Sequence, residues 1–82
     1  MRQVIYFSTS WCPSCQTTTP AIDQLKKSGI QTAKFDADYD VSYVEKYNIK
    51  SVPTIVVLEN GNEIKRYSGA MGYDQLIKFV NN

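Results

Sequence analysis

The 82-residue sequence contains no histidine and has two cysteines, Cys12 and Cys15. The absence of histidine excludes histidine-based catalytic triads and histidine-ligated metal sites. Structural zinc takes four protein ligands, so two cysteines supply half of a site, and a dimer sharing the metal would be needed to complete it. We therefore expect a protein that works without a bound metal or organic cofactor.

Long apolar runs, glycine-rich loops and excess charge are also missing. No segment approaches the roughly 18 apolar residues that span a bilayer, and the four glycines form no phosphate-binding loop. Nine basic and eight acidic residues give a net charge of +1, which argues against a nucleic-acid or membrane partner. The apolar run at residues 1–7 lacks the cleavage site of a signal peptide. We expect a cytoplasmic monomer.

The residues that are present have the composition of an ordinary soluble globule, with 43% apolar and 21% charged residues. A chain of this length lies near the lower end of what buries an adequate core alone. We therefore expect one domain over residues 1–82.

Hydrophobic periodicity and turn signals predict seven elements in this domain. Val4–Ser8 is apolar on both faces, as in a central strand covered on both sides. Asn60-Gly61 is a strong hairpin signal, and Asp40 is a candidate N-cap. The expected elements are a strand at Val4–Ser8, a helix from the cysteines to about Lys27, a strand at Gln31–Ala37, a helix at Val41–Tyr47, strands at Thr54–Leu58 and Glu63–Ser68, and a helix at Tyr73–Val80.

This β-α-β-α-β-β-α order predicts an α/β fold with a four-stranded mixed sheet and helices on both faces. The first three elements form a right-handed parallel unit, and the expected strand order is second, first, third, fourth. Pro20 lies inside the first helix, where a proline either kinks the helix or marks the start of a separate one.

The segment Trp11-Cys12-Pro13-Ser14-Cys15 joins the end of the first strand to the start of the first helix. A two-residue spacer places both sulfurs within one helical turn, so a disulfide can form and break with little movement of the chain. Pro13 suits the first turn. Cys12 lies where free N–H groups and the helix dipole favour a thiolate. The pair divides into an exposed attacking cysteine, Cys12, and a buried resolving cysteine, Cys15.

A purely structural disulfide is the alternative interpretation of this pair. It would close a very small loop and therefore remove little chain entropy. A reducing cytosol also disfavours such a bond. The motif therefore favours thiol–disulfide exchange.

The motif and its surroundings resemble the thioredoxin family. The shared marks are the Trp11–Cys15 motif after an apolar strand, Pro20, Val52-Pro53-Thr54 before a buried strand, Asn60-Gly61, and Gly69-Ala70. They follow the family's order from residue 4 to residue 80. The resemblance implies the thioredoxin fold and a protein-disulfide reductase, in which Cys12 attacks the target disulfide and Cys15 resolves the mixed disulfide.

The resemblance also implies a substrate-binding surface around the cysteines. Val52-Pro53 is expected to be a cis peptide facing them, whereas base rates alone favour a trans bond. A cis bond would let the Val52 backbone pair with substrate as a short added strand. The other expected substrate-binding residues are Trp11, Pro13, Ser14, Gly69 and Ala70; packing alone is the alternative role for Trp11.

The same resemblance implies partners of two kinds. Disulfide-containing proteins, of which a ribonucleotide reductase is one example, are the expected substrates, and a thioredoxin-reductase-type flavoprotein is the expected electron donor. The compact length and Pro13 support a second interpretation, a glutaredoxin-like protein recycled by glutathione, although Trp11 favours the thioredoxin type. A third interpretation is a non-catalytic adaptor, which would not need both sulfurs at a helix start.

One position departs from the family's pattern. The family usually has a buried aspartate six residues before the first cysteine, where this sequence has Tyr6, a poor base whose reference pKa is about 10. We expect Lys34, which normally neighbours that aspartate, to pair with Asp36 or lie at the surface. The proton of Cys15 would then pass to water or to the Cys12 thiolate, and resolution would be slower or more dependent on pH.

Overall fold

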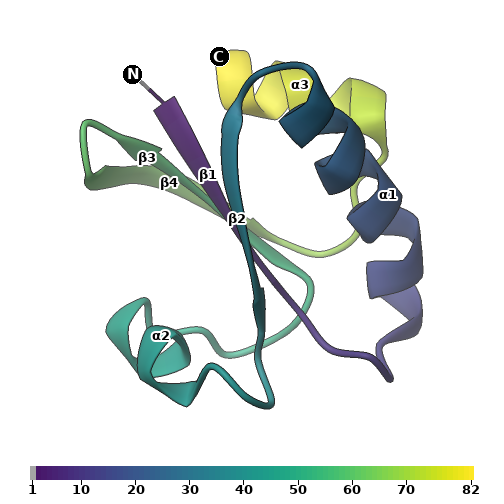
Figure 1. Cartoon of the computed structure of the whole chain (residues 1–82), viewed down its shortest axis with the longest axis vertical. Helices are drawn as coiled ribbons and strands as arrows, with labels where there is room; N and C mark the ends of the chain where they lie inside the picture. The colour runs from purple at the N-terminus through teal and green to yellow at the C-terminus, as the bar shows by residue number, and fades with distance from the viewer. Residues whose placement is uncertain (1) are drawn as a thin grey trace.

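The computed structural model describes residues 2–82, so Met1, the first residue of the predicted domain, lies outside the described part. The elements are β1 (Arg2–Ser8), α1 (Pro13–Lys27), β2 (Gln31–Asp36), α2 (Val41–Lys46), β3 (Thr54–Glu59), β4 (Asn62–Ser68) and α3 (Tyr73–Asn81). They form the predicted mixed sheet, with strand order β2-β1-β3-β4 (Figure 1). Within residues 2–82, no helix has the length and apolar character needed to cross a membrane.

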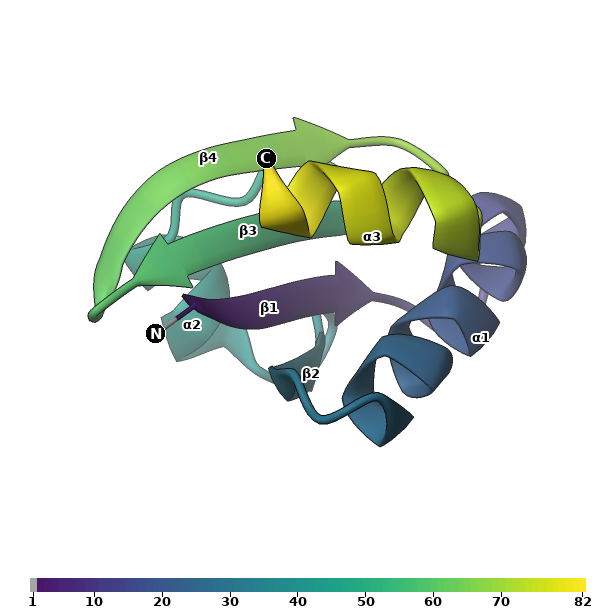
Figure 2. The same cartoon turned by 90° about the horizontal axis from the view of Figure 1, so that it is seen from above.

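β1 is the central strand and contributes to two apolar cores. It pairs in parallel with β2 and antiparallel with β3. The first core lies on the face covered by α1 and α3 and contains Val4 and Tyr6. The second core lies on the face that carries α2 and contains Ile5 and Phe7 (Figures 1 and 2). All four side chains are buried. The prediction of a strand covered on both sides is confirmed.

α1 runs without interruption from Pro13 to Lys27, so the alternative of a separate helix starting at Pro20 is wrong. One face of α1 is buried, at the three- and four-residue spacing of an amphipathic helix. The residues on that face are Cys15, Thr18, Ala21, Ile22 and Leu25. Burial of this face against the sheet holds the first turn of α1 at the carboxyl end of β1.

The hairpin between β3 and β4 follows the Asn60-Gly61 signal. Asn60 has φ 52° and Gly61 has φ 87°. Positive φ at both central residues is what a two-residue turn of the tight hairpin type requires, and glycine adopts it without a steric penalty. The pairing of β3 with β4 shifts register between Val57 and Leu58, an irregularity that the sequence pattern did not predict.

α2 covers the second core, but its expected cap is absent. Asp40 precedes α2 and makes no side-chain cap. Its Oδ2 instead accepts a hydrogen bond from the Asp36 N–H at 2.8 Å, which ties the segment before α2 to the end of β2. Val44 and Tyr47 pack against this core. Tyr43 is exposed and stacks on Phe35, with ring centroids 4.2 Å apart.

Candidate active site

Cys12 and Cys15 form a disulfide at the junction of β1 and α1, with their Cα atoms 5.3 Å apart. Cys12 is the N-cap of α1, and its Sγ accepts a hydrogen bond from the Cys15 N–H at 3.2 Å. An N-cap oxygen normally accepts the free N–H groups of the first turn. The sulfur of Cys12 takes that place, so the same N–H group and the helix dipole are positioned to stabilise a thiolate there after reduction.

Both cysteines are buried in this disulfide form. Cys12 is 4% exposed and Cys15 is 2% exposed. The prediction that Cys12 is exposed is therefore wrong, because its sulfur turns into the first turn of α1 and bonds to Cys15. Both cysteines line a surface cavity of about 360 Å³, which we call the helix-side cavity. It is lined by Thr9, Ser10, Cys12, Cys15, Gln16, Thr19 and Pro20.

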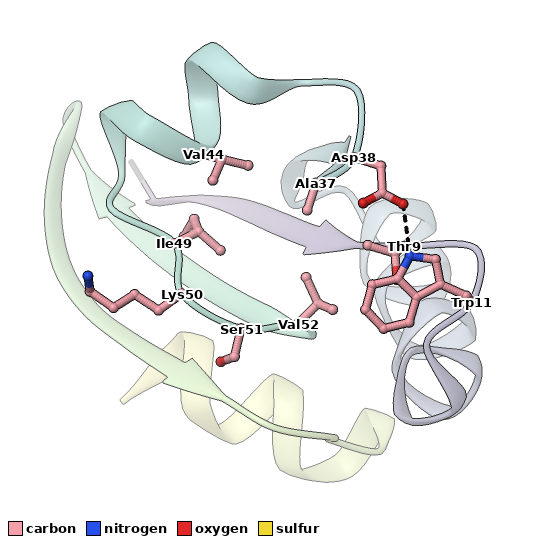
Figure 3. Close-up of a pocket in the computed structure, with 9 residues that line it drawn as sticks. All are labelled: Thr9, Trp11, Ala37, Asp38, Val44, Ile49, Lys50, Ser51 and Val52. Atoms are coloured by element: carbon pink, nitrogen blue, oxygen red, sulfur yellow. Dashed lines mark hydrogen bonds between the residues drawn. The ribbon is translucent and has the colours of Figure 1, made fainter.

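A second, larger cavity of about 400 Å³ lies where β1 and β2 end and the chain approaches β3 (Figure 3). We call it the Trp11 groove. It is lined by Thr9, Trp11, Ala37, Asp38, Val44, Ile49, Lys50, Ser51 and Val52. Five of the nine lining side chains are apolar and four are polar, a mixture typical of ligand-binding sites.

Trp11 stands exposed at one wall of this groove and is held there by Asp38. Its side chain is 67% exposed, and its Nε1–H donates to Asp38 Oδ2 at 2.8 Å (Figure 3). An exposed indole anchored at its polar end does not pack into the core, so packing alone does not explain Trp11. Sequence reasoning missed Asp38. The signal was its place just after β2, since parallel strands end at the same edge of a sheet.

Thr9 was also missed. It is 7% exposed and lines both the Trp11 groove and the helix-side cavity. Its Oγ1 has no hydrogen-bond partner among residues 2–82. Because an unpaired buried hydroxyl costs free energy, this group is available to bond with a molecule that enters either cavity.

The Val52-Pro53 bond is cis, as predicted. Pro53 is buried, and its carbonyl oxygen accepts from the Gly69 N–H at 2.9 Å, which places the loop after β4 beside it. Val52 lines the Trp11 groove, whereas Gly69 and Ala70 line neither cavity. The substrate-binding roles of these residues stay predictions.

Pro13 and Ser14, the two residues between the cysteines, are exposed on the first turn of α1. The structure therefore brings Trp11 and Val52 together in one groove and the two cysteines together in the other cavity. Pro13 and Ser14, which lie between the two cysteines in the sequence, are left on the surface, where a docking protein can reach them. Their substrate-binding roles also stay predictions.

Tyr6 is fully buried, and its hydroxyl lies near Cys15. Its hydroxyl is 2.8 Å from Thr19 Oγ1 and 3.4 Å from the Cys15 carbonyl oxygen. Burial raises the pKa of the Tyr6 phenol above its ordinary value, and the hydrogen bond with Thr19 opposes this to a smaller extent. The phenol therefore stays neutral at physiological pH and does not replace a carboxylate as a base.

Lys34 pairs with Asp23 of α1 and not with Asp36. The Lys34 Nζ lies 2.7 Å from Asp23 Oδ1. The Asp36 carboxylate has a different partner, since its Oδ1 accepts a hydrogen bond from the Asp38 N–H at 2.9 Å. The sequence pattern compared neighbours along one strand and could not show that α1 brings Asp23 over this face. Both partners are about half exposed, so the pair contributes little to stability.

Comparison with known proteins agrees with this geometry. The thioredoxin family model matches residues 1–82. A thioredoxin of Mycoplasma genitalium is 37% identical over 81 residues, covering 96% of this chain and 79% of the relative. A putative protein disulfide-isomerase of Schizosaccharomyces pombe is 32% identical over 81 residues, but the chain spans only 16% of that much longer protein.

Solved structures show the same fold. The thioredoxin of Fasciola hepatica superposes with a TM-score of 0.88 at 29% identity, covering 98% of this chain and 78% of that one. A mutant thioredoxin of Halobacterium salinarum gives a TM-score of 0.90 at 25% identity, covering 98% and 72%. Together with the Cys12–Cys15 pair at the start of α1, these likenesses show that the chain belongs to the thioredoxin family and is a thiol–disulfide oxidoreductase.

Proposed function

We propose that this protein reduces disulfides of other proteins, with Cys12 as the nucleophile and Cys15 as the resolving thiol. The observation that carries the proposal is the hydrogen bond from the Cys15 N–H to Cys12 Sγ. Among residues 2–82, no hydrogen bond to the sulfur of Cys15 is described, and Cys15 lies three residues further along α1 than the N-cap Cys12. Charge on sulfur is therefore favoured at Cys12, and the thiolate is the form that attacks disulfides.

The reaction proceeds in two exchanges. The Cys12 thiolate attacks one sulfur of the substrate disulfide, so that a Cys12–substrate bond forms and the first substrate thiolate leaves. Cys15 then loses its proton, and its thiolate attacks Cys12 Sγ. This step forms the Cys12–Cys15 disulfide and releases the second substrate thiolate. Two electrons have passed from the protein dithiol to the substrate, which leaves the disulfide form that the structure shows.

The Trp11 groove is the proposed docking site for the substrate chain next to its disulfide. Val52 and Trp11 both line it (Figure 3). An extended peptide there can place apolar side chains on Val44 and Ile49 and use the free Thr9 hydroxyl as a hydrogen-bond partner. The backbone next to Val52 is formed by Pro53 together with the loop residues Gly69 and Ala70. The surface next to the cysteines is formed by Pro13 and Ser14.

The Trp11–Asp38 hydrogen bond provides a direct test of this docking site. An Asp38→Ala variant should raise the KM for reduction of insulin by about fivefold, because the indole loses its hydrogen-bond acceptor and the groove loses one of its lining side chains. Steady-state kinetics measure the effect. Asp38→Asn keeps an acceptor oxygen and should lie near the wild-type KM. Equal KM values for all three proteins would contradict the assignment of the groove.

The proposed setting is the cytoplasm, with a thioredoxin-reductase-type flavoprotein as electron donor and proteins such as a ribonucleotide reductase among the substrates. Support for this electron donor comes from the exposed Trp11 beside the motif and from the similarity to thioredoxins, which are the proteins that such flavoproteins reduce. In this setting the protein carries electrons from the flavoprotein to target disulfides as a monomer.

Two NADPH-coupled assays run in parallel test the electron donor. With thioredoxin reductase, the protein should turn over insulin with sustained NADPH consumption. With glutathione and glutathione reductase, the rate should be at least about tenfold lower, which corresponds to about 1.4 kcal/mol of discrimination. A faster rate with glutathione would overturn the proposed donor and favour the glutaredoxin-like interpretation.

A further inference from the structure

The hydroxyl groups of Tyr6 and Thr19 form a pair directly beneath the resolving cysteine. Their oxygens are 2.8 Å apart. Tyr6 comes from β1 and is fully buried, whereas Thr19 lies in α1 and lines the helix-side cavity together with both cysteines. Thr19 is four residues after Cys15, so their side chains lie on the same face of the helix, one turn apart. The pair thus joins the buried core to the cavity in which Cys15 reacts.

Either hydroxyl of the Tyr6–Thr19 pair can be the donor, and the chemistry of the two groups favours one direction. A phenol is a stronger acid than an aliphatic hydroxyl and therefore the better donor. The other acceptor of Tyr6, the Cys15 carbonyl oxygen, lies at 3.4 Å, which is long for an O–H···O bond. We therefore take Tyr6 as the donor to Thr19, an arrangement that leaves the hydrogen of Thr19 free for another acceptor.

Thr19 differs in this respect from its neighbour. Thr18 Oγ1 bonds to the Ser14 carbonyl oxygen, the usual partner of a helical threonine four residues back. Among residues 2–82, the hydrogen bond described for Thr19 Oγ1 is the one to Tyr6. With Tyr6 as its donor, Thr19 keeps its hydroxyl hydrogen for an acceptor in the helix-side cavity, which Thr19 lines.

We propose that the Thr19 hydroxyl, oriented by Tyr6, donates a hydrogen bond to the Cys15 thiolate and so assists the step that resolves the mixed disulfide. This inference rests on the proposed roles of Cys12 and Cys15. In that step Cys15 gives its proton to solvent water in the helix-side cavity. Its thiolate forms the bond to Cys12 Sγ as the Cys12–substrate bond breaks, and the substrate leaves as a thiolate. In this role Thr19 would act on the sulfur of Cys15 directly, and Tyr6 is a positioning residue that acts through Thr19.

The charged groups around Tyr6 are consistent with a neutral phenol that acts only through hydrogen bonds. Lys34 of β2 and Asp23 of α1 act on the phenol electrostatically with opposite signs, and they are paired with each other. The Ser8 side chain of β1 is a further polar neighbour. Five residues of α3 pack on this core: Leu76, Ile77, Phe79 and Val80 are apolar, and Tyr73 adds a phenol. The helix-side cavity is lined by no carboxylate or amine side chain.

The reduced protein can be tested with dithiobis(nitrobenzoate), a chromogenic aromatic disulfide that reports each exchange separately. Attack by Cys12 releases the first coloured thiolate, and attack by Cys15 on Cys12 Sγ releases the second. Thr19→Val, which keeps the shape and removes the hydroxyl, should slow the second release about tenfold near neutral pH. It should also move the pH of half-maximal rate for that release upward by about one unit.

The first release separates this inference from the proposed function, because Thr19 does not act on Cys12 in this scheme. If the first release requires Cys12 and the second is slow in Thr19→Val, both proposals stand. If the first release does not require Cys12, the proposed function fails. If the second release keeps its wild-type rate and pH profile in Thr19→Val, the role of Thr19 is overturned.

Three further variants distinguish a specific hydroxyl from a general disturbance of α1. Thr19→Ser should restore most of the second-release rate. Thr17→Val makes the same change on the exposed face of the helix and should behave as wild type. Tyr6→Phe should slow the second release less than Thr19→Val does. It should add little in the double variant, because both changes remove the same hydrogen bond between Tyr6 and Thr19. Additive effects in the double variant would contradict the positioning role of Tyr6.

Discussion

A Cys12→Ser variant is expected to reduce insulin at least about a thousandfold more slowly than the wild-type protein, because a serine hydroxyl is not ionised near neutral pH and attacks disulfides poorly. The measurement is the initial rate of insulin reduction with a saturating electron donor. Circular dichroism of the variant controls for folding, since the exchange replaces one sulfur by oxygen at the N-cap of α1, where serine is itself a favoured residue.

The non-catalytic adaptor interpretation predicts a different result for the two cysteines. A protein with both Cys12→Ser and Cys15→Ser would keep full function if the fold served only to clamp a partner. We expect the double variant to be inactive in the reductase assay and to lose covalent capture of substrate. Retained insulin reduction in either variant would contradict the catalytic role of the pair.

The second large effect concerns the core that holds the active site in place. Ile22 is fully buried in the middle of α1 and packs in the first core with residues of β1 and β3. Ile22→Ala should lower the free energy of unfolding by about 2–5 kcal/mol, because it removes buried methyl groups and leaves a cavity. Small domains have about 5–15 kcal/mol in total, so this loss is a large part of it.

Urea denaturation of the disulfide form measures that change. Ile64→Ala is the matched control, because the same side chain in β4 is 46% exposed. It should alter the free energy of unfolding by no more than about 0.5 kcal/mol. Equal losses for the two variants would show that α1 does not pack on the sheet as the structure describes.

The fold could be predicted from short-range patterns. The two apolar faces of Val4–Ser8 indicated a central strand, and Asn60-Gly61 indicated the hairpin, because these signals depend on residues next to each other in the chain. The cis bond at Pro53 could not be predicted in that way, since base rates favour trans. It came from the resemblance to the thioredoxin family and is present in the structure.

The active site was predicted less completely, because its missing parts depend on contacts between distant elements. The hydrogen bond of Trp11 to Asp38 joins residues 27 positions apart, and Lys34 reaches Asp23 on a helix that packs over its strand. The burial of Cys12 was missed because a helix start suggests exposure, whereas the local bond to the Cys15 N–H turns the sulfur inward. Side-chain direction of this kind is not encoded in periodicity or spacing.

The division of labour between the two cysteines is the central claim, and trapping of a mixed disulfide tests it most directly. Reduced Cys15→Ser protein is mixed with oxidised insulin, the free thiols are alkylated, and the covalent adduct is digested and identified by mass spectrometry. The account predicts an adduct through Cys12 that accumulates because no resolving thiol remains, and little adduct from Cys12→Ser protein under the same conditions. Capture of insulin by Cys15 in the Cys12→Ser protein at a similar rate would contradict it.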